Sequence, residues 1–193
     1  MNKLTHAAAK TVFSGVVDYA LGQVNKNPEE AYEKIIDTAE KHMKDFQTGV
    51  NWDYLRRVAC NPEYTLNRYV TSIVKDLHPN VLKTTLMNLG FEALYNGTKT
   101  IREMRKIHNC NIPWIILMDP TSACNLHCTG CWAAEYGNKL NLSFEDMDSI
   151  VTQGKELGVY FYMMTGGEPM VRKKDIIELC RKHNDCVFFA YTN

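Results

Sequence analysis

The sequence predicts an α/β fold, in which a parallel sheet alternates with helices and is preceded by an all-helical segment. Two observations support this prediction. Apolar residues recur at helical spacing up to about residue 108, and three short apolar runs then alternate with two amphipathic stretches. The order β-α-β-α-β favours parallel strands joined by right-handed crossovers. We therefore divide the chain into a helical segment, 1–108, and an α/β segment, 109–193.

The helical segment carries two similar helix starts. Asn27-Pro28-Glu29 and Asn61-Pro62-Glu63 each place an asparagine cap before a proline at the first helical position and an acid in the first turn. Another helix is expected to begin at His78-Pro79, whereas Gly90 and Asn96-Gly97 are expected to interrupt the helical pattern. This segment shows no compelling strand and no fixed-period repeat, and we assign it no role.

The α/β segment begins with a predicted strand over 114–118. This run is continuous, apolar and rich in isoleucine, which is typical of a strand buried on both faces in a parallel sheet. Similar runs predict a second strand over 160–165 and a third over 187–191.

An amphipathic helix is expected between each pair of strands. The first should begin at Ser143, whose side chain can form a capping box with Asp146, and should end near Gly158. The second is expected over 174–183. The basic run before it, Arg172-Lys173-Lys174, is interpreted as a solvated helix start.

The composition excludes several classes of function. The 193 residues contain 22 Lys and Arg against 22 Asp and Glu, so no overall basic field favours nucleic acid. The first residues do not form a signal peptide, and no apolar run is long enough to span a membrane. Seven cysteines, unevenly spaced, do not fit a secreted disulfide framework. We therefore expect a cytoplasmic protein.

The strongest chemical signal is a group of three cysteines. Cys124, Cys128 and Cys131 form the pattern C-x3-C-x2-C directly after the first predicted strand. Thiolates are the donors that iron–sulfur clusters select, and three of them leave one iron of a four-iron cluster without a protein ligand. Such an iron can hold a substrate or a cofactor, as the open position of a catalytic metal site does.

Two alternatives remain open for these cysteines. An electron-transfer or redox-sensing protein would hold a cluster with a fourth cysteine, such as Cys110 or Cys60. A structural zinc site would also need a fourth ligand, and His127 lies inside the first gap, where a tetrahedral site would be cramped. Outside these alternatives, we interpret Cys60, Cys110, Cys180 and Cys186 as small buried apolar groups.

A second motif, Gly166-Gly167-Glu168-Pro169, follows the second predicted strand. Glycines at the end of a strand allow the backbone to approach a ligand closely. Asp119 and Thr121 follow the first strand, and Thr192 and Asn193 follow the third. These polar residues are further candidates to face a site at the carboxyl ends of the strands, although a turn role suits Asp119 equally well.

The two motifs, in this order and each after a predicted strand, resemble the radical S-adenosylmethionine (radical SAM) superfamily. The resemblance covers about residues 112–193. It implies a TIM-like barrel of about six βα units, a partial (βα)6 barrel of which this chain would form the first half. Because the sequence stops after the third strand, we expect a fragment of a longer protein that does not turn over substrate by itself.

The resemblance also implies a chemistry. Cys124, Cys128 and Cys131 would bind a [4Fe–4S] cluster, and SAM would chelate its fourth iron. One electron from the cluster would cleave SAM reductively to a 5′-deoxyadenosyl radical, which abstracts hydrogen from a substrate that the sequence does not identify. The cluster would be oxygen-sensitive, and its electron donor would be a protein such as flavodoxin or ferredoxin.

The motif 166–169 would bind the amino group of SAM, largely through backbone carbonyls. Gly130 would lie beside the adenine, at a position where members of the family usually carry an aromatic residue. Trp132 could replace part of that missing ring, although a core or lid role is the simpler interpretation.

Overall fold

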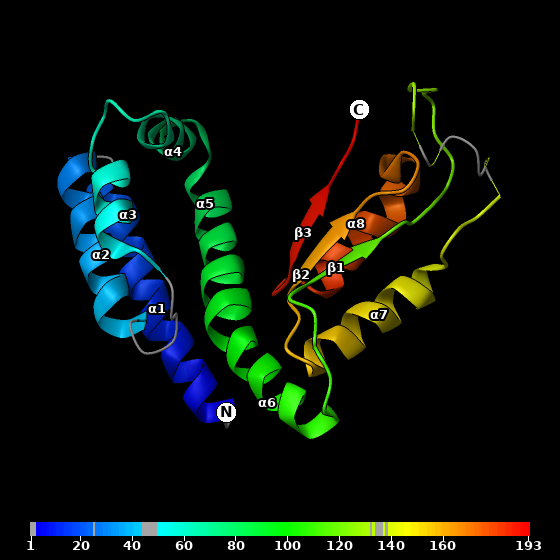
Figure 1. Ribbon diagram of the computed structural model, residues 1–193, viewed down its shortest axis with the longest axis horizontal. Coiled ribbons are helices and arrows are strands. Elements are labelled where there is room, and N and C mark those ends of the chain that lie inside the picture. The colour runs from blue at the N-terminus through cyan, green and yellow to red at the C-terminus, as the bar shows by residue number, and fades with distance from the viewer. Residues whose placement is uncertain (1–2, 25, 44–49, 132, 134–136, 138) are drawn as a thin grey trace. The chain divides into compact units, whose positions relative to one another are not determined.

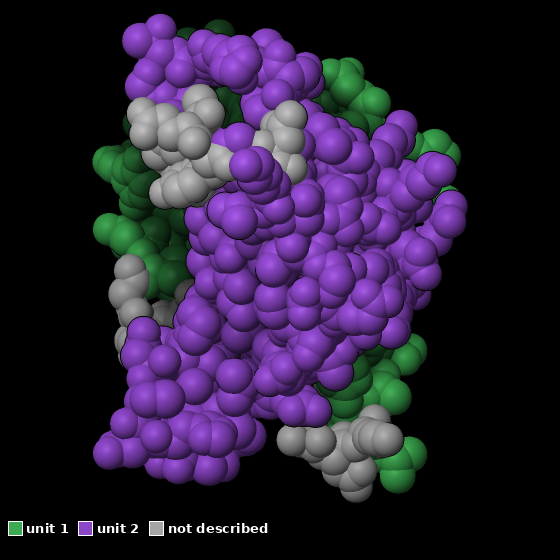
Figure 2. Space-filling model, turned by 90° about the vertical axis from the view of Figure 1, so that its right-hand side faces the viewer, with its two compact units in different colours: residues 1–86 green, residues 87–193 purple. Residues whose placement is uncertain are grey.

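The computed structural model describes residues 3–24, 26–43, 50–131, 133, 137 and 139–193. The chain divides into two compact units, residues 1–86 and 87–193, which Figure 2 shows in separate colours. The predicted division at residue 108 follows the change from helices to strands, and it stays a prediction. The compact units divide earlier because the last helices of the helical segment pack with the sheet.

The first unit is helical. Its elements, labelled in Figure 1, are α1 (Lys3–Val24), α2 (Pro28–Met43), α3 (Trp52–Ala59), α4 (Thr65–Asp76) and α5 (Pro79–Thr85). A small core joins α1 and α2 through Val24, Ala31 and Tyr32. Arg56 of α3 pairs with Asp37 at 2.8 Å and also with Glu40, both on α2.

The predicted helix start at Asn61 is wrong. Its side chain accepts a hydrogen bond from the backbone N–H of Glu63 at 3.0 Å and closes a turn, and the helix begins later, at Thr65. Asparagine stabilises such turns as readily as it caps helices, so the sequence signal was ambiguous. The expected start at His78-Pro79 is confirmed: the His78 ring accepts from the backbone N–H of Asn80.

The second unit combines helices with a parallel sheet. Its elements are the π-helical stretch η1 (Leu86–Gly97, which begins at the last residue of the first unit), α6 (Thr98–His108), β1 (Ile115–Met118), α7 (Phe144–Glu156), β2 (Phe161–Met164), the 3-10 turn η3 (Pro169–Arg172), α8 (Lys173–Lys182) and β3 (Val187–Ala190). The sheet order is β1-β2-β3, and both pairs are parallel. The predicted α/β class and its three parallel strands are therefore confirmed, while the barrel stays a prediction.

Local signals placed the first crossover helix correctly. Ser143 and Asp146 form the predicted capping box, and α7 ends just before Gly158, which adopts a φ of 91°. α7 and α8 pack on one side of the sheet (Figure 1). The core there is formed by side chains with almost no exposed surface: Met147, Val151, Tyr162, Met164 and Leu179.

The first strand is not buried on both faces, although its apolar run had predicted this. Leu117 of β1 is 60% exposed and Phe189 of β3 is 50% exposed, while Met118 and Tyr162 point into the core. The reason is that the crossover helices cover one face, and apolar composition alone does not reveal which face is covered.

Gly90 and Asn96-Gly97 do not interrupt the helical pattern, because η1 continues directly into α6. Gly97 serves packing instead: a Cβ atom there would lie 2.4 Å from the carbonyl oxygen of Gly158. Asn88 of η1 also donates to the backbone oxygens of Asn184 and Cys186, each at 2.9 Å. These contacts join η1 to the starts of β2 and β3.

Among the described residues, none of the helices combines the length and apolar character needed to cross a bilayer.

Candidate functional site

The three cysteines lie in a loop that leaves the carboxyl end of β1 and returns to α7. Its two ends run side by side, because Thr121 and Asn141 form an antiparallel bridge. The Ser122 N–H donates to the Leu140 oxygen at 2.8 Å, and the Leu142 N–H donates to the Pro120 oxygen at 3.1 Å. These bonds close the base of the cysteine loop, which we define as residues 123–139.

Inside this loop, Cys124 and Cys131 are half-buried and Cys128 is exposed. The Cys131 N–H donates to the Cys128 oxygen at 3.1 Å, and the Leu126 N–H donates to the Cys124 sulfur at 3.4 Å. Gly130 has a φ of 75°, and nothing lies within 4 Å of a Cβ built on it, so the turn needs glycine for its backbone conformation. Trp132 lies outside the described residues.

As a donor set, the cysteine loop fits an iron–sulfur cluster. It offers three free thiols at short spacing, and thiolate is the ligand that iron–sulfur clusters select. In the part of the chain that the structure describes, no three His, Cys, Asp or Glu side chains converge as they would around a bound metal ion. The structure therefore brings the three cysteines into one loop but does not bring their sulfur atoms together.

The Gly-Gly-Glu-Pro turn is bonded to the start of the cysteine loop. The Gly167 N–H donates to the Thr121 oxygen at 2.9 Å, and the Glu168 N–H donates to the Ala123 oxygen at 2.7 Å. A Cβ atom on Gly167 would lie 2.2 Å from that Ala123 oxygen, and one on Gly166 would lie 2.8 Å from the Thr121 oxygen. Both glycines thus permit two backbone segments to touch, a reason that the sequence did not reveal.

A cavity of about 340 Å³ lies beside this contact. It is lined by residues of the first loop, of the returning segment and of the glycine turn: Asp119, Thr121, Ser122, Ala133, Leu140, Asn141, Leu142, Gly166 and Gly167. The Thr165 hydroxyl donates to the Asp119 carboxylate at 2.5 Å across the ends of β2 and β1. Asp119 and Thr121 therefore do face one cavity with the glycine turn, as their places after β1 had predicted.

Glu168 does not line this cavity. Its buried carboxylate accepts hydrogen bonds from the Met170 N–H at 2.8 Å, the Thr192 hydroxyl at 2.8 Å and the Asn193 N–H at 3.0 Å. Burial by itself would raise the pKa of Glu168, but the bonds donated by Asn193, Met170 and Thr192 outweigh burial and hold the pKa below its usual value. Thr192 and Asn193 thus bind this carboxylate.

Two residues around the site were missed by sequence reasoning. Arg172, expected in a solvated basic run, donates to the Leu142 oxygen at 2.7 Å and to Asp175 at 2.6 Å. Asn125 pairs its amide with that of Asn193 at 3.0 and 3.1 Å. Asn125 could have been found from its place, since it is a polar residue next to a predicted ligand cysteine. No pattern in the sequence singled out Arg172.

The remaining cysteines only partly match their interpretation as buried apolar groups. Cys186 is buried, and burial, as the largest cause, raises the pKa of its thiol. Cys60 and Cys180 are half-buried, whereas Cys110 is exposed just after α6, so that interpretation is wrong for Cys110.

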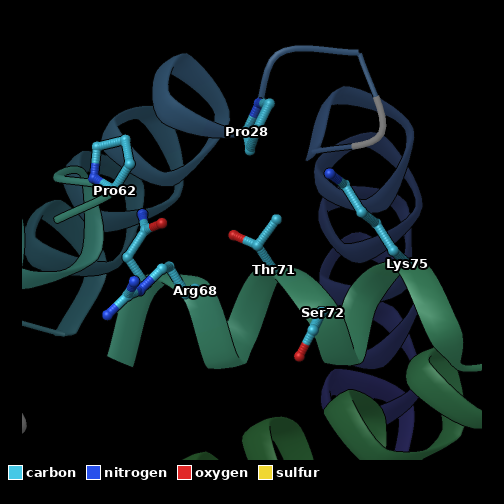
Figure 3. A pocket seen from close by; sticks show the side chains of 7 residues that line it. Pro28, Pro62, Arg68, Thr71, Ser72 and Lys75 are labelled. Atoms are coloured by element: carbon cyan, nitrogen blue, oxygen red, sulfur yellow. The ribbon is translucent and has the colours of Figure 1, made fainter. Parts of the chain in front are cut away.

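A second cavity, of about 320 Å³, lies within the first unit (Figure 3). It is lined by residues of α4, of the start of α2 and of the turn before α4: Pro28, Pro62, Asn67, Arg68, Thr71, Ser72 and Lys75. The Thr71 hydroxyl already pairs with the Tyr32 hydroxyl at 3.0 Å, and the Asn67 amide donates to the Ala59 oxygen. Both sequence motifs lie in the second unit, so this cavity is a weaker candidate than the one beside the cysteine loop.

Comparison with known proteins gives two matches. Residues 118–193 match the family model of the radical SAM superfamily. A GTP 3′,8-cyclase from Geobacter sulfurreducens is 40% identical over 65 residues, which cover 32% of this chain and 20% of the cyclase. The match thus spans about a fifth of the length of that curated relative. No solved structure matches the chain.

Proposed function

We propose that the second unit, of which residues 118–193 match the radical SAM family model, binds a [4Fe–4S] cluster and SAM for radical chemistry. Cys124, Cys128 and Cys131 would be the cluster ligands, leaving one iron open to SAM. When bound, the cluster and SAM together would supply a 5′-deoxyadenosyl radical for hydrogen abstraction.

The observation that carries this proposal is the backbone contact between the two motifs. Bonds from Gly167 and Glu168 to Thr121 and Ala123 hold the glycine turn against the residues that lead into Cys124. A cofactor that touches both motifs at once needs this proximity. The cavity lined by Gly166 and Gly167 lies beside this contact, and we assign the methionine moiety of SAM to it.

The chain's own residues would prepare this site in three ways. The base of the cysteine loop fixes where the loop leaves the sheet, and the positive φ of Gly130 turns the backbone just before Cys131. We place the adenine beside Gly130. The Asp119 carboxylate, held by the Thr165 hydroxyl, puts a negative charge at the cavity, which suits the ammonium group of the methionine moiety.

We further propose that the sheet is the first half of a (βα)6 barrel. An electron donor such as flavodoxin or ferredoxin would serve the cluster, and an oxygen-sensitive cluster would be consistent with a reducing cytoplasm.

Anaerobic reconstitution with iron and sulfide tests the proposal. We expect about four irons per chain and, after reduction, an electron paramagnetic resonance signal that changes when SAM is added. Cys128→Ala should lose this SAM-responsive signal. The matched control is Cys110→Ala, which removes an exposed cysteine outside the loop and should keep the signal.

Three outcomes would contradict the proposal. A full, SAM-responsive cluster in Cys128→Ala would remove the cysteine loop from the ligand set. Zinc bound in place of a cluster would replace the radical chemistry with a structural metal site. A cluster that ignores SAM and is lost in Cys110→Ala or Cys60→Ala would instead indicate an electron-transfer protein with a fourth cysteine ligand.

A further inference from the structure

Three polar side chains from three separate segments meet at the carboxyl end of the sheet. Glu168 belongs to the turn after β2, Asn193 follows β3 and Asn125 lies in the cysteine loop. The Asn193 amide nitrogen donates to the Glu168 carboxylate at 2.6 Å and to the Asn125 side-chain oxygen at 3.0 Å. The Asn125 amide nitrogen donates back to the Asn193 side-chain oxygen at 3.1 Å.

The charge of Glu168 fixes the direction of every bond in this cluster. An ionised carboxylate can only accept, so Asn193 must turn its NH2 group toward Glu168. The second N–H of that group is then left to donate to Asn125, whose own NH2 group must face the Asn193 oxygen. The hydrogen bonds therefore determine which side of each amide carries the oxygen and which carries the NH2 group.

The cluster acts on the part of the loop that holds the first cysteine. Asn125 follows Cys124 directly, and both asparagines are exposed at the surface. Among the hydrogen bonds between described residues, the Asn125–Asn193 pair is what joins residues 124–131 to the rest of the unit. The other bonds within this stretch are local turns.

We propose that Asn125 and Asn193 are positioning residues which, held by Glu168, fix Cys124 at the carboxyl end of the sheet. The inference rests on the proposed function only for the role of Cys124 as a ligand. The bonds act in the metal-free protein, so they are testable without a cluster.

The test is the rate at which iodoacetamide alkylates Cys124 in the metal-free protein, followed by peptide mass spectrometry. Cys110, exposed and outside the loop, serves as the reference thiol in the same sample. Asn193→Ala and Asn125→Ala should each accelerate alkylation of Cys124 by up to about tenfold, because each removes both bonds of the amide pair. The rate at Cys110 should not change.

A double-mutant cycle separates positioning from general loosening. If the two side chains act through each other, Asn125→Ala combined with Asn193→Ala should alkylate no faster than the quicker single variant. If the accelerations of the two single variants multiply in the double variant, the proposal is overturned. Asn193→Asp nearly keeps the side-chain size but sets a second carboxylate against Glu168, so it should expose Cys124 at least as much as Asn193→Ala does. A harmless Asn193→Asp would also overturn it.

Asn184→Ala is the matched control. Asn184 lies at the opposite end of β3, is exposed, and contributes its backbone oxygen rather than its side chain to the bond from Asn88. An equal acceleration at Cys124 in this variant, or an unchanged rate in Asn193→Ala, would refute the positioning role. Faster alkylation in Asn193→Ala with no SAM-responsive cluster in the wild type would uphold positioning while rejecting the proposed function.

Discussion

Glu168 shows how a single buried charge can organise a site at the residue scale. Its carboxylate accepts two backbone N–H groups and two side-chain donors, from Met170, Thr192 and Asn193. A buried carboxylate is costly unless its oxygens are satisfied, and here four donors satisfy them. The negative charge, and not only the size of the side chain, is therefore needed.

We predict that Glu168→Gln destabilises the protein although it preserves the shape of the side chain. The glutamine NH2 group cannot accept, so at least one donor loses its hydrogen bond to a charged acceptor, which costs about 1.5–3 kcal/mol of unfolding free energy. Urea denaturation measures the loss. Glu178→Gln, on the exposed side of α8, is the control and should change stability little. Equal stability of the two variants would contradict this account.

Replacing glycine by alanine should have opposite effects on stability in the glycine turn and in α1. Gly167→Ala would place a Cβ atom 2.2 Å from the Ala123 backbone oxygen, which cannot move aside as a flexible side chain would. We expect a loss of about 1–3 kcal/mol. Gly15→Ala, inside α1 with nothing within 4 Å of the new Cβ, should instead raise helix stability by about 0.5–1 kcal/mol. Thermal unfolding of both variants checks the contrast, and a stabilising Gly167→Ala would disprove the close contact.

At the scale of elements, the packing of α7 against β2 depends on one glycine of the helix and one tyrosine hydroxyl of the strand. The buried Tyr162 hydroxyl lies near the Val151 oxygen at 3.1 Å and the Val159 oxygen at 2.9 Å. A Cβ atom on Gly154 would come within 2.3 Å of this hydroxyl. A glycine in the last turn of α7 therefore makes room for the polar end of a core tyrosine.

This packing predicts that two substitutions, one at Gly154 and one at Tyr162, partly compensate each other in their effect on stability. Gly154→Ala should cost about 1–3 kcal/mol through overlap with the hydroxyl, and Tyr162→Phe should cost about 1 kcal/mol through the lost hydrogen bond. In the double variant the overlap disappears, so its loss should be smaller than the sum of the two. Chemical denaturation of the four proteins gives the coupling energy, and strict additivity would show that Gly154 does not accommodate the hydroxyl.

Elements set by local signals were predictable from sequence, whereas those set by distant contacts were not. Ser143 predicted the start of α7 because its capping partner is only three residues away. Gly97 was mistaken for a break because its reason, the backbone of Gly158, is remote in sequence. The same distinction holds at the site. Both motifs were visible, but Asn125 and Asn193 are 68 residues apart, and no local pattern pairs them.

On the scale of the whole molecule, the radical SAM match falls within the second unit. Residues 118–193 carry it, and they contain β2, β3 and the last residue of β1. The first unit has its own small core and its own cavity. The sequence motifs therefore identified a family resemblance for the second unit alone, and the helical unit offered no comparable signal.

Acid should weaken the second unit through Glu168. Its pKa in the folded protein is below the ordinary value of 4.5, so its contribution to stability is complete above that value and is lost as the pH falls through the folded pKa. The stability difference between wild type and Glu168→Gln should thus be constant from neutral pH to about pH 5 and then shrink. Urea midpoints of both proteins across this range test the sign, and a difference that grows with acid would reverse it.

Because the base of the cysteine loop is closed, the loop with its three cysteines could be gained by one scaffold or moved to another. Because Ser122 and Leu140 are already hydrogen-bonded neighbours, everything between them is an insertion whose two ends meet. The entropy of closing such an insertion changes slowly with its length, so its sequence and size can vary while the path from β1 to α7 stays the same. A short hairpin in place of the loop would therefore leave a scaffold without the three cysteines of the motif, and another scaffold with the same two neighbours could receive the loop.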